Sequence, residues 1–115
     1  AVEQIASGLV FNADGVPVMV VTSGANRVSE DRLAAHLGAE DVAMADPDLV
    51  REATGYGIGG VPPFCHDRQV PVLIDPRLLE FDTLWAAAGT PQTVFPIDPD
   101  DLVAAADATT ADVTE

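Results

Sequence analysis

Residues 44–63 read Met-Ala-Asp-Pro-Asp-Leu-Val-Arg-Glu-Ala-Thr-Gly-Tyr-Gly-Ile-Gly-Gly-Val-Pro-Pro, and they decide the fold of this chain. Asp46 is placed to cap a helix, and Pro47 takes the first helical position, where its missing N–H costs nothing. Gly55 is suited to end that helix in a left-handed conformation. The glycines and prolines that follow clear side chains from the backbone and stiffen it. We therefore expect a short capped helix that leads into a rigid loop with exposed backbone N–H groups.

Around this stretch, short apolar runs alternate with turn signals. Residues 5–11 and 16–22 predict two strands joined by a hairpin turn at 12–15. The unbroken apolar run at 18–21 is typical of a strand that is buried on both faces. A helix is expected between a Ser29 cap and a stop at Gly38. The other expected strands are residues 42–45, 70–74, 83–88 and 93–97.

The Asp-Pro helix start occurs twice more, at residues 75–76 and 98–99. The first predicts a single helical turn, and the second predicts a helix through Leu102 and Ala106. Trp85 is interpreted as a core residue of its strand rather than as a stacking platform. The tail from Thr109 to Glu115 is expected to be loosely attached. Together these elements predict one α+β or mixed α/β domain over residues 1–115.

The charge of the chain is unusual for its length of 115 residues. The net charge is −14, there is no lysine, and all five basic residues are arginines. Such a surface suits a cytoplasm of very high salt, although an ordinary acidic protein is an equal alternative. The acidity argues against non-specific nucleic-acid binding, but it leaves open the recognition of a small uncharged part of a nucleic acid.

The sequence also bounds the location and the cofactors. Its apolar runs are far shorter than the ~18–20 residues of a membrane span, and its first residues lack a signal-peptide pattern. We therefore expect a soluble cytoplasmic protein. The single Cys65 excludes an intrachain disulfide, and neither His36 nor His66 has metal-ligand spacing, so no metal and no cofactor are expected.

No familiar catalytic motif surrounds the glycine loop. It lacks the Gly-Lys-Ser/Thr of a phosphate-binding loop, and it opens no βαβ unit, which excludes a dinucleotide fingerprint. No serine stands in a Gly-x-Ser-x-Gly elbow. From the residues alone, the loop is either a structural turn or the backbone-lined wall of a pocket.

Six ordered blocks of this sequence resemble the YbaK family, the aminoacyl-tRNA deacylases related to the editing insertion of bacterial prolyl-tRNA synthetase. The resemblance covers nearly the whole chain, and residues 54–63 are its most specific part. The blocks are Ser-Gly-Ala-Asn-Arg-Val (23–28), Leu-Gly-Ala (37–39), Met-Ala-Asp-Pro (44–47), Thr-Gly-Tyr-Gly-Ile-Gly-Gly-Val-Pro-Pro (54–63), Pro-Val-Leu-Ile-Asp (71–75) and Ala-Ala-Gly-Thr (87–90).

The resemblance implies a curved, mixed and largely antiparallel sheet with short helices around a small pocket. It implies hydrolysis of the ester between a wrong amino acid and the tRNA 3′ end, first of all cysteine or alanine on proline tRNA, with a prolyl-tRNA synthetase as a possible partner. Arg27 is expected either to pair with a tRNA phosphate or to be a solvated surface charge. The implied substrate-binding residues are Gly59, Gly60, Val61, Pro62, Pro63, Ala88, Gly89 and Arg27.

The sequence departs from the family pattern at three points. The family lysine that positions the substrate is replaced by Ser7, and the family serine before Ala88 is replaced by Ala87. The family's N-terminal helices have no counterpart in these residues. Two hypotheses therefore stand: an editing deacylase that works through backbone groups and the substrate's own 2′-hydroxyl, and a non-catalytic module that binds aminoacyl-tRNA or a synthetase.

Overall fold

The computed structural model describes residues 4–23, 27–55, 70–87 and 94–114. These residues form seven strands in one sheet, three α-helices and a short 3₁₀-helix. The elements in chain order are β1 (Ile5–Ala13), β2 (Val16–Ser23), α1 (Glu30–Leu37), β3 (Val42–Met44), α2 (Pro47–Thr54), β4 (Val72–Ile74), η2 (Pro76–Glu80), β5 (Leu84–Ala87), β6 (Val94–Ile97), α3 (Pro99–Ala106) and β7 (Thr109–Thr110).

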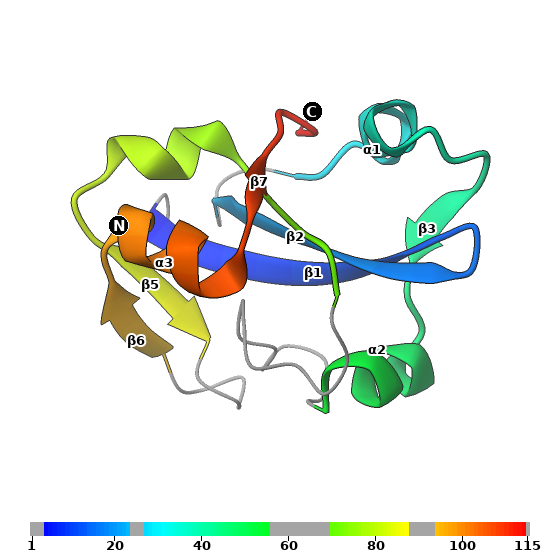
Figure 1. Cartoon of the computed structure of the whole chain (residues 1–115), viewed down its shortest axis with the longest axis horizontal. Coiled ribbons are helices and arrows are strands. Elements are labelled where there is room, and N and C mark those ends of the chain that lie inside the picture. Colours follow the sequence, from blue (N-terminus) through cyan, green and yellow to red (C-terminus); the bar gives the residue numbers. More distant parts are fainter. Residues whose placement is uncertain (1–3, 24–26, 56–69, 88–93, 115) are drawn as a thin grey trace.

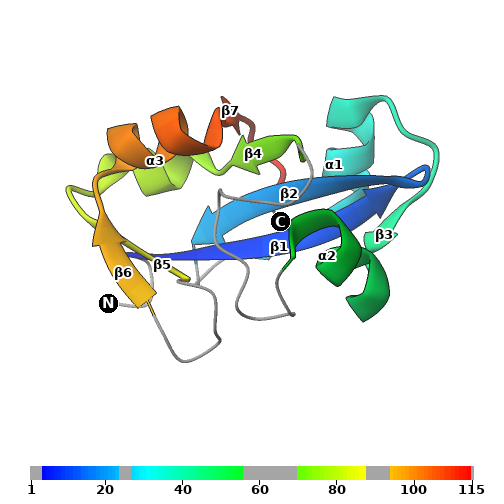
Figure 2. The same cartoon turned by 60° about the horizontal axis from the view of Figure 1, so that its bottom comes forward.

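The strand order β6-β5-β1-β2-β4-β7, with β3 also paired to β1, confirms the predicted mixed sheet. The pairs β1–β2, β1–β3 and β5–β6 are antiparallel and include the longest ladder, whereas β1–β5, β2–β4 and β4–β7 are parallel. Strands β5 and β6 lie at one end of the molecule, and the β1–β2 turn and β3 lie at the other (Figures 1 and 2).

The β1–β2 hairpin turns through two residues, Asp14 and Gly15, because Ala13 pairs directly with Val16. Both turn residues have positive φ, +50° and +90°, which matches the twist of the strands that they join. The Asp14 carboxylate also accepts the N–H groups of Glu40 (3.0 Å) and Asp41 (2.8 Å). The turn is therefore tied to the start of β3.

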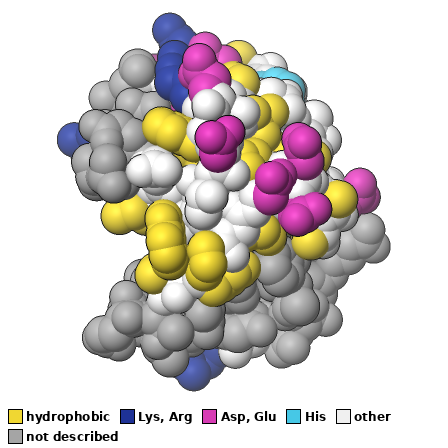
Figure 3. Space-filling model, turned by 90° about the vertical axis from the view of Figure 1, so that its left-hand side faces the viewer, with side chains coloured by type: hydrophobic (Ala, Val, Ile, Leu, Met, Phe, Trp, Pro, Cys, Tyr) yellow, Lys and Arg dark blue, Asp and Glu magenta, His cyan; other side chains and the backbone are white. Residues whose placement is uncertain are grey.

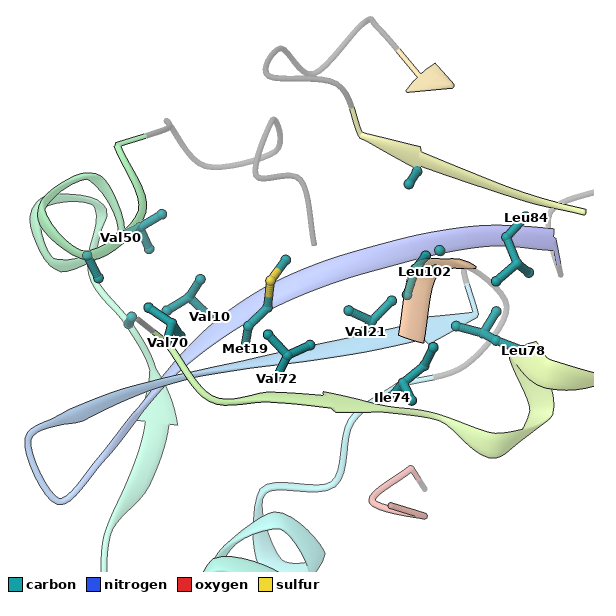
Figure 4. Close-up of a cluster of buried hydrophobic side chains, with 14 residues drawn as sticks. Val10, Met19, Val21, Val50, Val70, Val72, Ile74, Leu78, Leu84 and Leu102 are labelled. Atoms are coloured by element: carbon teal, nitrogen blue, oxygen red, sulfur yellow. The ribbon is translucent and has the colours of Figure 1, made fainter. Parts of the chain in front are cut away.

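Both faces of the sheet are packed. On one face, α2, η2 and α3 cover a cluster that includes Met19, Val21 and Ile74, and Figure 4 shows its side chains gathered along β1, β2 and β4. On the other face, α1 covers a second cluster around Phe11 and Val20. Residues 18–21 of β2 are buried, which confirms the prediction of a strand covered on both sides.

The helix ends also follow the predictions. Asp46, Asp75 and Asp98 each accept a backbone N–H at the start of a helix whose first residue is proline. Gly38 and Gly55 end α1 and α2 with φ of +68° and +83°. Each α-helix is eight residues long, and no helix in the described ranges is long and apolar enough to span a membrane.

The expectation of a loose tail is wrong for residues 109–114. Strand β7 pairs with β4, and Val113 accepts a hydrogen bond from the Ser29 N–H (2.7 Å) while its side chain is only 1% exposed. The Arg77 guanidinium donates to Asp112 (3.3 Å) and to the buried Thr114 hydroxyl (2.6 Å). The tail was misjudged because its partners, Ser29 and Arg77, are remote in sequence, although the alternation of apolar and polar residues in the tail is typical of a strand with one buried face.

We predict that Val113→Ala destabilises the protein by about 2 kcal/mol. Each buried methylene-sized group contributes ~0.8 kcal/mol, and a residual cavity adds to the loss. Thr109→Ala removes an exposed side chain from the same segment and serves as the matched control, with an expected change within about 0.5 kcal/mol. Urea unfolding measures both values. Equal, negligible effects would mean that the tail contributes nothing to the core.

A second prediction concerns the Asp14 turn. The two N–H donors hold the pKa of Asp14 below its ordinary value of 3.8. The folded state therefore binds this proton more weakly than the unfolded state, so the stabilisation is present above the ordinary pKa and is lost as the pH falls through the lowered one. Asp14→Asn keeps a residue that tolerates positive φ but removes the charge.

We expect Asp14→Asn to melt at a lower temperature at pH 7 and to lose less stability than the wild type on acidification. Thermal melts from pH 7 to pH 2 measure this difference. Asp82→Asn, at an exposed carboxylate outside the turn, is the control and should keep the wild-type profile. If the profiles of Asp14→Asn and the wild type were parallel, the Asp14 carboxylate would not stabilise the turn.

Candidate functional site

Ser7, the residue predicted to replace the family lysine, lies in β1 between two neighbouring strands. It pairs with Thr22 of β2, and the preceding residue Ala6 pairs with Ala86 of β5. Its side chain is half-buried. A serine hydroxyl is a neutral donor and acceptor, whereas a lysine would bring a positive charge and three donors. This position can therefore hold a polar group by hydrogen bonding, but it cannot attract an anion by charge.

The described residues on either side of the glycine-proline segment, residues 56–69, are held by hydrogen bonds and core packing. Before it, Thr54 is buried, and its hydroxyl donates to the Val50 carbonyl (2.7 Å). Gly55 donates its N–H to the Arg51 carbonyl (2.9 Å) in the left-handed conformation. After it, Val70 joins the same hydrophobic cluster as Val50, which Figure 4 shows. The positions of the residues that precede and follow this segment are thus fixed within the described part of the fold.

The predicted binding residues of this segment lie outside the described residues. They are Gly59, Gly60, Val61, Pro62 and Pro63. Their role as the wall of a pocket therefore stays a prediction.

The second predicted segment connects β5 to β6. Ala88 and Gly89 also lie outside the described residues, but the strands that lead to them are described. Ala87 pairs with Val94 at the end of the β5–β6 ladder, and β5 lies next to the start of β1. The structure therefore brings the strand end that leads to Ala88 next to the strand that carries Ser7.

Arg27 is exposed and directly precedes Val28, which forms an isolated bridge with Thr114. The chain leaves β2 at Ser23, which pairs with Ala6 of β1. Arg27 thus follows the strand end nearest to Ser7 in the hairpin. This placement fits both interpretations made from the sequence, a phosphate partner and a solvated charge.

The ionisable groups with shifted pKa values lie elsewhere. Besides Asp14, the neighbouring Asp75 and Asp112 carboxylates raise the pKa of Arg77. Desolvation opposes the ionisation of Asp112, but the charge of Arg77 and hydrogen bonds from Thr114 and Arg77 outweigh it and lower its pKa. These groups hold a turn and the C-terminal segment in place. Among the described residues, no cluster of three or more histidine, cysteine or acidic side chains is arranged to bind a metal.

Comparison with known families gives a match to the aminoacyl-tRNA editing domain over residues 1–105. The chain belongs to the aminoacyl-tRNA editing domain family. This confirms the resemblance that was based on the six sequence blocks, and it places the protein in a family of aminoacyl-tRNA deacylases related to the prolyl-tRNA synthetase editing domain.

Individual relatives of this editing domain support the same family. The chain is 32% identical over 85 residues to the proline–tRNA ligase of Leuconostoc mesenteroides, and 32% identical over 73 residues to the multifunctional Ser/Thr-tRNA deacylase ProXp-y of Escherichia coli. These matches cover 74% and 63% of the chain. The chain spans 15% of the ligase and 44% of the deacylase, and 65% of a further curated relative.

A crystal structure described as a candidate trans-editing enzyme for prolyl tRNA synthetase superposes with a TM-score of 0.95 at 37% identity. The match covers all of this chain and 73% of that one. The fold of the editing domain is therefore shared along the full length of the chain.

Trp85 corrects one sequence-based interpretation. It is 40% exposed and is not a core residue, whereas its neighbours Leu84 and Ala86 are fully buried. Side chains of a strand alternate between the two faces, so a strand that buries Leu84 and Ala86 must turn Trp85 the other way. Because every residue of the strand is apolar, its composition does not distinguish the buried face from the exposed one. The alternation of side chains along the strand was the signal that could have predicted the exposure of Trp85.

Proposed function

We propose that this editing domain is a deacylase that hydrolyses the ester between a wrong amino acid and the 3′ end of a tRNA. Proline tRNA carrying cysteine or alanine is the first candidate substrate. The observation that carries the proposal is the family match over residues 1–105, together with the full-length fold match. The name of ProXp-y adds serine and threonine as candidate amino acids.

In the proposed reaction, water adds to the carbonyl carbon of the aminoacyl ester. The bond between that carbon and the ribose oxygen then breaks, and the ribose oxygen takes up a proton to leave as a hydroxyl. We expect backbone N–H groups of residues 59–63 to stabilise the negative charge that develops on the carbonyl oxygen. The 2′-hydroxyl of the substrate is the expected group that orients the water.

The replacement at Ser7 favours a second function, a module that binds aminoacyl-tRNA or a prolyl-tRNA synthetase without turnover. The family lysine is a charged positioning group, and the half-buried Ser7 lacks that charge. The intact loop from Gly59 to Pro63 favours the enzyme, because a loop without a function would be expected to replace glycines that raise the entropy of the unfolded chain.

Turnover separates the two functions. We expect the protein to release amino acid from at least one member of a panel of tRNAs carrying cysteine, alanine, serine or threonine, faster than the uncatalysed ester loss. Correctly charged prolyl-tRNA is the control and should stay intact. Binding of the panel without any hydrolysis would reject the deacylase and support the binding module.

A gain-of-function variant tests the site at Ser7. If the geometry of the family site persists, Ser7→Lys should raise kcat by roughly tenfold or more, which corresponds to at least ~1.4 kcal/mol of transition-state stabilisation. An added lysine also attracts RNA wherever it lies on an acidic protein.

Thr109→Lys therefore serves as the matched control, because β7 is at the edge of the sheet farthest from β5. It is exposed, and it should lower KM at most while leaving kcat unchanged. Equal effects of Ser7→Lys and Thr109→Lys would show that the added charge acts without a specific site.

The glycine loop has its own test. Gly60→Val should abolish turnover, with little change in the melting temperature, if the backbone at residue 60 approaches the substrate. Ester hydrolysis and thermal melts of the same preparation measure the two effects. Full activity in this variant would mean that the segment is only a structural turn.

A further inference from the structure

Three neighbouring strands carry a row of exposed apolar side chains. Trp85 of β5 pairs with Ile5 of β1 on one side and with Pro96 of β6 on the other. Ile5 is 41% exposed, Trp85 is 40% exposed, and Pro96 is exposed. On the opposite face of β5, Leu84 and Ala86 belong to the hydrophobic core under α3. We call Ile5, Trp85, Pro96 and the 51%-exposed Val94 the apolar row.

The apolar row is uncharged in a strongly acidic protein. Strands β1, β5 and β6 contain no charged residue, although the chain carries 19 acidic residues. The acids nearest to β5 and β6 along the chain, Asp82 and Asp98, lie at the same end of the β5–β6 ladder, because Leu84 pairs with Ile97 there. Glu3, two residues before Ile5, lies outside the described residues. Figure 3 views this end of the molecule and shows several groups of hydrophobic side chains there, with acidic side chains beside some of them.

The other end of the ladder leads to the predicted binding residues. From Trp85, two residues of β5 lead to Ala87, about 7 Å along the strand. The alternation of β1 places Ser7 on the same face as Ile5 and therefore as Trp85. Two strand residues, about 7 Å, separate Trp85 from the strand end that precedes Ala88, and the same spacing separates Ile5 from Ser7. This distance is comparable to the length of one nucleoside, so a planar group held on Trp85 would place the rest of its nucleotide near Ser7.

We propose that Trp85 is a stacking platform for a nucleobase at the 3′ end of the tRNA, and that Ile5 and Pro96 flank the base. The proposal rests on the proposed interaction with aminoacyl-tRNA and adds a positioning residue to it. A nucleobase is flat and uncharged, so it suits an aromatic ring in an uncharged surface better than a phosphate does. Acidic side chains around the site repel the phosphates but not the uncharged base, so they do not weaken the stacking contact itself.

The tryptophan itself reports on this contact, because it is the only one in the chain. The probe is an RNA minihelix that ends in CCA and carries alanine through a non-hydrolysable amide. We expect it to change the tryptophan fluorescence on binding. The same minihelix with an abasic 3′-terminal nucleotide should bind more weakly and leave the fluorescence nearly unchanged.

Variants measured by the anisotropy of labelled RNA complete a double-mutant cycle. Trp85→Ala should weaken binding of the intact minihelix by about 5- to 100-fold, the effect of losing one stacked base, and Trp85→Phe should retain most of the affinity. Against the abasic minihelix, Trp85→Ala should have almost no effect. Met44→Ala, which shortens a 56%-exposed side chain on β3 at the opposite end of the molecule, is the control and should bind as the wild type does.

Three results would overturn the inference. Unchanged affinity of Trp85→Ala would exclude stacking, and an equal loss with intact and abasic RNA would show a role that does not involve the base. A dimer in sedimentation that Trp85→Ala dissociates would mean that the apolar row is covered by a second copy of this chain. The inference and the deacylase can fail separately. Binding that depends on the base, without hydrolysis, would support the inference and reject the deacylase. Hydrolysis together with unchanged binding of Trp85→Ala would support the deacylase and reject the inference.

Discussion

Strand β1 is hydrogen-bonded along both of its edges, and this pairing determines the position of the other elements around the candidate site. One edge pairs with β2 from Ala6 to Ala13, and the other pairs first with β5 and then with β3. A shift of one residue in this register would move Ser7 to the opposite face of the sheet. The two-residue turn at Asp14 and Gly15 opposes such a shift, because its backbone conformation and its bonds to Glu40 and Asp41 fit one register only.

Local signals in the sequence predicted the elements well. Three Asp-Pro pairs identified helix starts, since an aspartate cap and a proline in the first turn both act within a few residues. The apolar run at 18–21 predicted a strand covered on both faces for a similar reason. The partners of the strands were not predictable in this way. That β5 lies parallel to β1, about eighty residues earlier in the chain, depends on packing of the whole sheet rather than on any local pattern.

The same distinction applies to the candidate site. The role of Ser7 came from a resemblance, and the structure added its neighbours, Thr22 and β5. The attachment of residues 109–114 was missed because its partners, Ser29 and Arg77, are remote in sequence. The exposure of Trp85 could have been deduced from strand alternation, yet its apolar neighbours favoured a core interpretation. Composition indicates how much of a strand is apolar, whereas alternation indicates which side chains are buried.

Under the proposed function, an acidic editing domain without lysine recognises RNA mainly through short-range contacts. Its net charge of −14 repels phosphates over about the Debye length, ~8 Å at physiological salt, and Ser7 supplies no compensating charge. Among the described residues, no strand carries a charged residue, so the acidic groups described lie on the helices and loops around an uncharged sheet. Hydrogen bonds from backbone N–H groups and contacts with an aromatic ring act within a few ångströms, where the charge of the rest of the protein matters least. Approach of the aminoacylated 3′-terminal nucleoside, which ends in an amino group, ahead of the tRNA phosphates is the geometry that such a charge distribution permits.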